Sequence, residues 1–277
     1  MPGELASDTT ILHSGGRGPA AARNVGWQAA TTQWVCFLDD DVVPTPSWSQ
    51  RLAADLAAPA DVGATQAVIV VPRPEDRRLT DQERNVAALE NAGWITADLA
   101  VRRTALVQLC GFDERFPRAY REDSDFALRA AGAGWRFEHG SRSTYHPLRT
   151  GRWWSSVSAQ RGNRDDALMR AIHGRRWTIQ RGRRRRHVAI TVAGAVALAA
   201  AMTGHRRVAA AFGLAWITGT TELAAARIQS VQRSRREVTA MLVTSVAIPP
   251  AATWWWWTGL ARWRAGKVHA WVAAGCH

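Results

Sequence analysis

A short apolar run that ends in three consecutive aspartates is the feature that most restricts how this 277-residue chain can fold. The run, QWVCFLD at 33–39, has the length and composition of a buried strand. Charged side chains are rarely buried without partners, so they are expected where the chain leaves the sheet. Asp39, Asp40 and Asp41 therefore mark the carboxyl end of a strand.

Strand-like and helix-like segments alternate through the first 150 residues, with Gly and Pro between them. Strands are expected at 9–14, 33–39 and 62–72, and helices at 18–30 and 46–58. The alternation predicts an α/β domain over residues 1–150, with a largely parallel sheet and helices on both faces. Such sheets bind ligands beside the carboxyl ends of their strands, where the three aspartates lie.

Asp39 and Asp41 form an Asp-x-Asp pattern that suits a divalent cation. Carboxylate oxygens are preferred by hard cations, and Mg²⁺ often shares its coordination shell with substrate phosphates. In an extended chain the two side chains would point to the same side. The alternative is that an aspartate here only caps or terminates a structural element.

A second acidic cluster begins the segment REDSDFALRAAGAG, which has the pattern of a helix. Glu122, Asp123 and Asp125 fall in its first turn, and glycine follows its end. A carboxylate near other acids can have its pKa raised and act as a general base. The alternative is that these acids only stabilise the N-terminus of the helix.

Together, the segments GPAAARNVGWQAATTQWVCFLDDDVVP and GWITADLAVRRTALVQLCGFDERFPRAYREDSDFALRAAGAGW resemble the family 2 glycosyltransferases, which have the GT-A fold. The resemblance covers residues 9 to about 150. It implies a Rossmann-like domain that moves a sugar from a nucleotide-diphosphate sugar to a hydroxyl acceptor, with inversion and with Mg²⁺ or Mn²⁺. A glycan or lipid-linked acceptor of cell-envelope synthesis is expected.

The resemblance also implies roles for individual residues. Asp123, with its neighbour Glu122, would deprotonate the acceptor hydroxyl. The donor would be bound by Arg23, Asn24, Asp39, Asp40 and Asp98, and the metal by Asp39, Asp41 and His146. Two alternatives stay open: a surface position for Asp98 and a structural turn position for His146.

Family members open with a strand-helix-strand unit that holds the nucleoside base, and this sequence begins at what resembles their third strand. The expected fold is therefore a GT-A domain lacking its first strand-helix-strand unit. Two functions are compatible with this expectation. The chain is an active glycosyltransferase, or it is a non-catalytic truncated remnant or membrane assembly partner of one.

Residues 151–187 form a basic connector that contains several Trp residues. The connector contributes to a formal net charge of +13, which indicates an anionic partner. Nucleic acid is one alternative, but no nucleic-acid-binding motif accompanies the connector, and we expect no nucleic acid partner. A polybasic stretch with aromatic residues before apolar segments is typical of interfacial helices at a membrane.

Residues 188–277 form an apolar tail in which 188–203 and 238–260 lack charge and 208–226 carries only Glu222. A membrane span needs about 20 apolar residues, so the first segment is short. Arginines before the segments place the catalytic domain on the cytoplasmic side of the cell membrane. A buried helical hairpin in a soluble domain is the alternative, and a homo-oligomer is compatible with the sequence.

Overall fold

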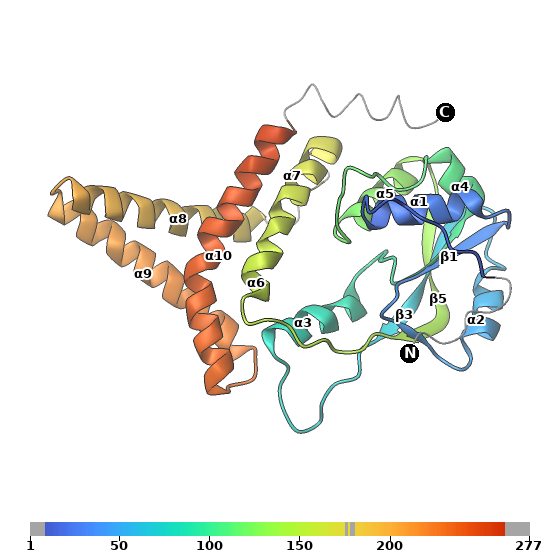
Figure 1. Cartoon of the computed structure of the whole chain (residues 1–277), viewed down its shortest axis with the longest axis horizontal. Helices are drawn as coiled ribbons and strands as arrows, with labels where there is room; N and C mark the ends of the chain where they lie inside the picture. Colours follow the sequence, from blue (N-terminus) through green and yellow to red (C-terminus); the bar gives the residue numbers. More distant parts are fainter. Residues whose placement is uncertain (1–8, 175–176, 178–180, 264–277) are drawn as a thin grey trace. The chain divides into compact units, whose positions relative to one another are not determined.

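The computed structural model describes residues 9–174, 177 and 181–263 (Figure 1). The chain forms two compact units, of which the first contains Met1–Ile69 and Gly93–Thr144. The second contains Val70–Ala92 and Tyr145–His277. The expected connector and tail therefore belong to the second unit, together with a segment from the N-terminal half of the chain.

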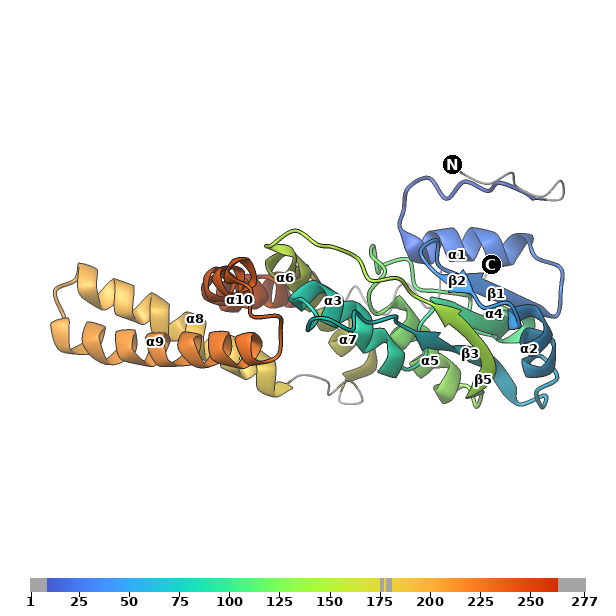
Figure 2. The ribbon, with the colours of Figure 1, turned by 90° about the horizontal axis from the view of Figure 1, so that it is seen from below.

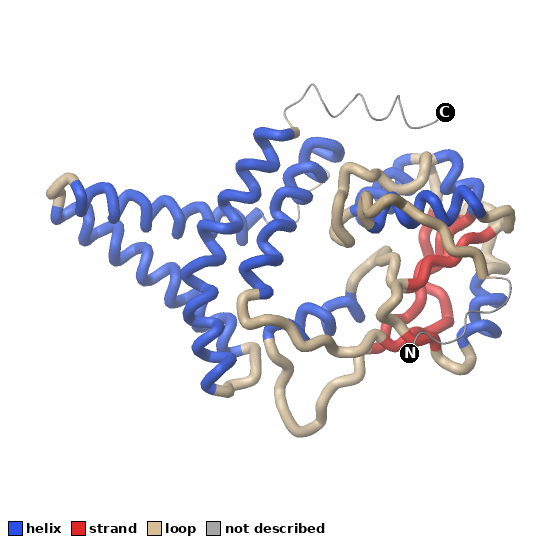
Figure 3. Tube along the Cα trace, in the orientation of Figure 1, coloured by secondary structure: helices blue, strands red, loops and turns tan. Residues whose placement is uncertain are grey.

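A five-stranded sheet with the order β1-β4-β3-β5-β2 forms the centre of the first unit (Figure 3). The strands are β1 (Trp34–Leu38), β2 (Val43–Pro44), β3 (Val62–Val70), β4 (Asp98–Arg102) and β5 (Arg136–Tyr145). β4 pairs antiparallel with both β1 and β3. β3 and β5 run parallel, because the N–H groups of Arg136 and His146 donate to the carbonyl oxygens of Asp61 and Val70 at the two ends of the pair.

The predicted α/β class and the strands expected at 33–39 and 62–72 are confirmed, but a largely parallel sheet is wrong for the strands beside β4. Residues 9–14, expected to be a strand, form none. β4 was not expected as a strand. It enters the sheet between two strands that precede it in the sequence, so its direction depends on the route of the chain through 71–97, which no local pattern encodes.

One face of the sheet carries the apolar core of the unit, covered by α1 (Pro19–Ala29), α4 (Arg103–Gln108) and α5 (Glu122–Gly132). Phe37 of β1 lies opposite Leu99 of β4, and both side chains join this core. The ring of Phe112 lies 5.3 Å from that of Phe37, edge to face, and 4.8 Å from that of Phe126, stacked. Burial of each such side chain contributes about 1.5–3 kcal/mol.

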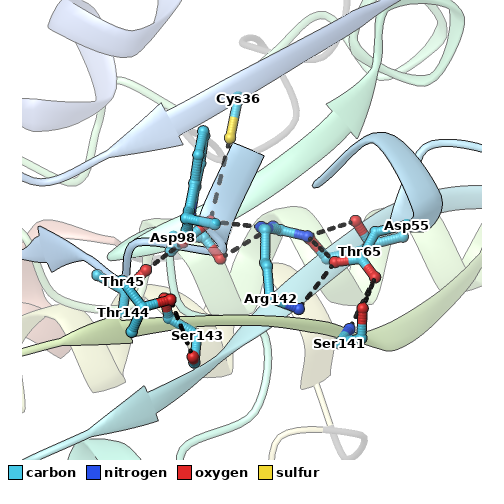
Figure 4. A network of polar contacts seen from close by, with 10 residues as sticks. Cys36, Thr45, Asp55, Thr65, Asp98, Ser141, Arg142, Ser143 and Thr144 are labelled. Atoms are coloured by element: carbon cyan, nitrogen blue, oxygen red, sulfur yellow. Dashed lines mark hydrogen bonds and ion pairs between the residues drawn. The ribbon is translucent and has the colours of Figure 1, made fainter. Parts of the chain in front are cut away.

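The opposite face carries a buried polar network centred on Arg142 of β5 (Figure 4). Nε of Arg142 donates to Asp98 Oδ1 at 2.8 Å, and Nη1 donates to Asp55 Oδ2 and Thr65 Oγ1, each at 2.9 Å. Asp55 ends α2 (Trp48–Asp55), and Trp48 Nε1 donates to Asp98 Oδ2 at 2.6 Å. Helix α2 is thereby fixed to the second face of the sheet.

The second unit is helical. Its shorter elements are α3 (Asp81–Ala87), η1 (Ala88–Asn91), α6 (Ser155–Ser158), η2 (Ala159–Arg161) and α7 (Gly162–His173). Its long helices are α8 (Arg181–Met202), α9 (Arg206–Gln229) and α10 (Arg235–Arg262). The expectation of a helical, apolar C-terminal region is confirmed, and among the described residues three helices are long and apolar enough to cross a membrane. Helix α10 continues through Pro249 and Pro250.

Helices α8 and α9 form an antiparallel hairpin (Figure 2), and glycines allow the two backbones to approach closely. A Cβ atom at Gly194 would lie 2.8 Å from Cδ1 of Trp216, and one at Gly219 would lie 2.8 Å from Cγ1 of Ile190. The turn between the helices contains Gly204, whose φ is +79°. Glycine adopts this left-handed conformation without steric cost.

The segment from the N-terminal half binds the end of α9 and the start of α10. Arg227 of α9 donates from Nη2 to Asp81 Oδ2 at 2.9 Å, and from Nη1 to Thr244 Oγ1 of α10 at 2.8 Å. The backbone N–H of Asp81 donates to Glu237 Oε1 at 2.8 Å. Asp81 is the first residue of α3, whose N-terminus is stabilised by a capping box of Thr80 and Glu83. This capped helix start is the part of α3 that contacts α9 and α10.

Candidate active site

The guanidinium group of Arg23 joins the two acidic clusters that the sequence singles out. From α1, Arg23 donates through Nη1 to Glu122 Oε1 at 2.7 Å and through Nη2 to Asp39 Oδ1 at 3.0 Å. The Glu122 side chain is 2% exposed, whereas that of Asp39 is 34% exposed. One cation therefore links the carboxyl end of β1 to the N-terminus of α5, and the site opens to solvent on the Asp39 side.

Local sequence explains the position of Arg23. Pro19 occupies the first turn of α1, where its missing N–H costs nothing. Gly18 precedes it with φ +106°, and a Cβ there would lie 2.7 Å from the carbonyl oxygen of Pro117. Only glycine fits this close approach. The start of α1 is thus held against the loop that leads into α5.

Asn24 fastens the same loop. Its Nδ2 donates to the carbonyl oxygen of Phe112 and its Oδ1 accepts from the N–H of Phe112, both at 2.8 Å. Its Oδ1 also accepts from Trp27 Nε1 at 3.1 Å. Both ends of the Asn24 amide therefore form hydrogen bonds within the protein. Through these bonds Asn24 fixes the loop at Phe112 to α1. Its expected contact with the donor stays a prediction.

The carboxyl groups of Glu122 and Asp123 have raised pKa values. Burial is the main cause that raises the pKa of Glu122 to about 7, and repulsion from Asp123 is the second. The positive charge of Arg23 acts in the opposite direction and lowers this pKa. Burial also raises the pKa of Asp123, although the backbone N–H of Ser124 donates to its Oδ1 at 2.6 Å and opposes the shift. A carboxylate made more basic in this way is suited to accept a proton near neutral pH.

The backbone turns at Asp40 and Asp41 and does not stay extended. The premise that would place Asp39 and Asp41 on the same side is therefore wrong. Asp40 is exposed, and Asp39 and Asp41 are half-buried. No group of three or more His, Cys, Asp or Glu side chains with metal-binding geometry occurs in the part of the chain that the structure describes.

The aspartates nevertheless fit a cation of the Mg²⁺ type. Mg²⁺ is commonly bound through one or two carboxylates, and water and substrate phosphates complete its shell. Asp39 presents carboxylate oxygens at the half-open end of the site, with one of them bonded to Arg23. A dedicated cage of three protein ligands is not needed for this chemistry.

Comparison with known proteins agrees with this geometry. Residues 5–111 match the sequence model of the family described as Glycosyl transferase family 2. Over these residues the chain is similar to the family 2 glycosyltransferases, and we call the first unit the glycosyltransferase domain. Its mixed α/β sheet is consistent with the GT-A fold that the motifs imply.

Two curated relatives resemble the glycosyltransferase domain. They are the pre-mycofactocin glycosyltransferases of Mycobacterium tuberculosis strains CDC 1551 / Oshkosh and ATCC 25618 / H37Rv, each 33% identical over 144 residues. The alignment covers 47% of this chain and 31% of each relative. The chain thus spans about a third of the length of the relatives it matches.

The family match includes the Arg23 and Asp39 half of the site and ends before α5. Glu122 and Asp123 lie beyond the matched residues, so the structure is what connects them to the glycosyltransferase motif.

Asp98 is a buried member of the polar network in the glycosyltransferase domain. Its side chain is fully buried and accepts from Arg142, Trp48 and Thr144. The alternative of a surface position is therefore wrong. A contact with the donor would require an accessible oxygen, and this arrangement gives that contact no support.

His146 follows β5 and belongs to the second unit. It is buried, with Nδ1 3.1 Å from the carbonyl oxygen of Pro147. Its proposed role as a metal ligand stays a prediction, and so does the alternative of a structural turn residue.

Sequence reasoning missed two residues of the glycosyltransferase domain. Arg142, which organises the buried network, lies in the polar run HGSRSTY, where nothing distinguishes it from a solvated residue. Arg121 precedes α5 with φ +80°. A left-handed conformation in a non-glycine residue stores strain and often marks a functional site, but no sequence signal announces it.

Proposed function

We propose that the first unit transfers a sugar from a nucleotide-diphosphate sugar to a hydroxyl group, with inversion at the anomeric carbon. The contact of Arg23 with both Asp39 and Glu122 is the observation that carries this proposal. It holds the half-buried Asp39 at the strand end beside the buried Glu122, which precedes Asp123 in the sequence. The first suits a diphosphate with its cation, and the second suits proton transfer.

In the proposed reaction the Asp123 carboxylate accepts the proton of the acceptor hydroxyl. The hydroxyl oxygen forms a bond to the anomeric carbon, and the bond from that carbon to the diphosphate oxygen breaks, with its electron pair leaving on the diphosphate. A single base is sufficient for this displacement because no enzyme nucleophile is needed. Burial of Asp123 favours the step, since it raises the proton affinity of the carboxylate.

Asp39 and Asp41 are the residues that would hold Mg²⁺ or Mn²⁺. The metal would neutralise charge that develops on the departing diphosphate. Arg23 orients Asp39 through the 3.0 Å bond and keeps a positive charge at the same end of the site. Asp40, exposed in the turn, is the proposed additional donor contact.

We further propose that the acceptor is a glycan or lipid-linked hydroxyl compound of the cell envelope, and that the reaction takes place on the cytoplasmic side of the membrane. Three span-length helices suggest membrane association. The relatives are named for pre-mycofactocin, so an acceptor of that class is the alternative for this chain.

The proposal is tested with the full chain in detergent and a panel of nucleotide-diphosphate sugars. We expect Mg²⁺- or Mn²⁺-dependent release of a nucleoside diphosphate in the presence of a membrane lipid extract. Asp123→Asn should reduce the rate by about 10²–10⁴-fold. Asp61→Asn, which removes a carboxylate from an exposed ion pair, is the matched control and should leave the rate unchanged.

Equal rates for Asp123→Asn and the control would show that Asp123 is not the base. Donor binding without turnover, for every donor and with either metal, would contradict catalysis and would favour the non-catalytic assembly partner.

A further inference from the structure

The second unit contains a groove that the proposed reaction does not use. It lies between the α6–η2 segment and the middle of α10 and has a volume of about 350 Å³. Its walls are mainly apolar, with Trp153, Trp154 and Val157 on one side and Val243, Ala247 and Trp255 on α10. This volume falls at the lower end of the range for ligand-binding sites.

The α10 side of the groove is mainly apolar. Thr244 also lies in this wall, but its hydroxyl donates to the carbonyl oxygen of Ala240 at 2.6 Å and accepts from Arg227 at 2.8 Å. A ligand along this wall would therefore make mainly apolar contacts, with the indole of Trp255 at one end.

Positive charge lies at the rim. Arg161, which is exposed, places its guanidinium 5.9 Å from the ring centre of Trp255. The guanidinium of the exposed Arg152 lies 5.3 Å from the ring centre of Trp154. Trp and Arg together are typical of the boundary between hydrocarbon and lipid headgroups.

The groove is continuous with apolar surface on α10, one of the span-length helices. Val243, Val246 and Trp254 are 50%, 46% and 65% exposed. A second α-helix is about 10–12 Å across, and a volume of about 350 Å³ is small for a segment of that width. A single hydrocarbon chain is thin enough to enter.

We propose that the groove holds a hydrocarbon chain of a membrane lipid whose anionic headgroup pairs with Arg161. The proposal rests on the membrane association included in the proposed function, but it is independent of the transfer chemistry. It assigns a lipid site to residues 153–161 and to the middle of α10. A second copy of the chain and an apolar peptide are the competing occupants.

The test uses the full chain in nanodiscs of phosphatidylcholine. The probe is a small fraction of phosphatidylglycerol with a photoactivatable diazirine on one acyl chain, and labelled residues are mapped by mass spectrometry. We expect labelling at 153–161 and 243–255. Ala247→Phe, which fills the groove, should reduce this labelling at least fivefold. Val246→Phe, next to it on α10 but outside the groove wall, should leave it unchanged.

The headgroup is tested with Arg161→Gln. This change should lower phosphatidylglycerol labelling to the level of an equivalent phosphatidylcholine probe, and Arg233→Gln, at an exposed residue of the α9–α10 loop, should not. If Ala247→Phe fails to elute as the unmodified protein does, Ala251→Phe fills the same groove.

Three results would each overturn the proposal. They are unchanged labelling in both groove-filling variants, equal labelling by the phosphatidylglycerol and phosphatidylcholine probes, and crosslinks between two copies of the chain at the groove. Specific labelling without any sugar transfer would leave the lipid site intact and contradict only the proposed enzyme function. Failure of the chain to enter the nanodiscs would overturn the lipid site and the membrane assignment. It would not bear on the transfer chemistry, which the nucleoside diphosphate release assay tests separately.

Discussion

The protonation of Glu122 depends on its position in the fold. Its Oε1 is bonded to Arg23, but its Oε2 is buried and has no hydrogen-bond partner in the part of the chain that the structure describes. An ionised carboxylate with an unpartnered buried oxygen is costly, and this cost favours the protonated form. The pKa raised to about 7 follows from this burial and from the neighbouring Asp123.

This shift predicts how stability varies with pH. Folding raises the pKa of Glu122 from 4.5 to about 7, so the folded state binds the proton more tightly. The stabilisation is fully present below pH 4.5 and is lost as the pH rises through about 7. At 1.36 kcal/mol per pKa unit, the loss is up to about 3 kcal/mol. Pulse proteolysis in urea and detergent at pH 4.5 and 7.5 measures it.

Glu122→Gln should reduce the pH dependence, because the amide does not titrate in this range, while the raised pKa of Asp123 keeps part of it. Glu138→Gln, at a half-exposed position on β5, is the matched control and should retain the slope of the unmodified protein. A Glu122→Gln protein with an unchanged slope would locate the titration elsewhere.

Among the elements, the sheet of the first unit depends on the Arg142 network. Asp98 is 0% and Asp55 5% exposed, and Arg142 neutralises both. Removing one partner of a buried ion pair leaves an uncompensated buried charge, which costs about 3–5 kcal/mol.

We therefore expect Arg142→Met to lower the free energy of unfolding of the first unit by about 3–5 kcal/mol in urea. Adding Asp98→Asn to Arg142→Met should restore part of the lost free energy of unfolding, because it removes one of the two buried carboxylates that Arg142 neutralises. Arg136→Gln, in an ion pair with 55% exposure on both sides, should change stability by about 1 kcal/mol or less. Equal losses for the buried and exposed changes would contradict a structural role for the network.

The α8–α9 hairpin provides a second element-scale prediction. Gly219 faces Ile190 so closely that a Cβ atom would lie 2.8 Å from Cγ1, whereas a Cβ atom at Gly213 on the same helix would meet no atom of another described residue within 4 Å. Gly219→Leu should push the helices apart and lower the midpoint of thermal aggregation in detergent. The midpoint of Gly213→Leu should equal or exceed that of the unmodified protein, because leucine has a higher helix propensity than glycine. Indistinguishable midpoints would show that the close contact does not stabilise the hairpin.

At the scale of the whole molecule, the three long helices predict the mode of membrane attachment. The full chain should float with liposomes and stay with the membrane in 1 M salt and in alkaline carbonate, because apolar burial is not screened by ions. A sedimentation assay after each wash measures this. Release by salt alone would show that the chain is held by its Arg-rich surface charge and that the helices do not cross.

The sequence predicted the elements of the first unit better than their arrangement. A helix near 18–30 and strands near 33–39 and 62–72 follow from periodicity and from Gly and Pro. The strand at 98–102 was missed because DLAVR is short and its two faces differ: Asp98 enters the polar network and Leu99 the apolar core. Local patterns also could not predict that 70–92 would join the second unit.

By itself the sequence determined the chemical inventory: strand-end aspartates, an acidic helix start, basic and Trp-rich connecting residues, and three apolar segments. These are properties of consecutive residues. Only the tertiary structure shows that Arg23 bonds to both Asp39 and Glu122. The same holds for the hydrogen bond from Arg142 to Asp98 and for the groove beside α10. Each depends on residues far apart in the chain, which no pattern of consecutive residues brings together.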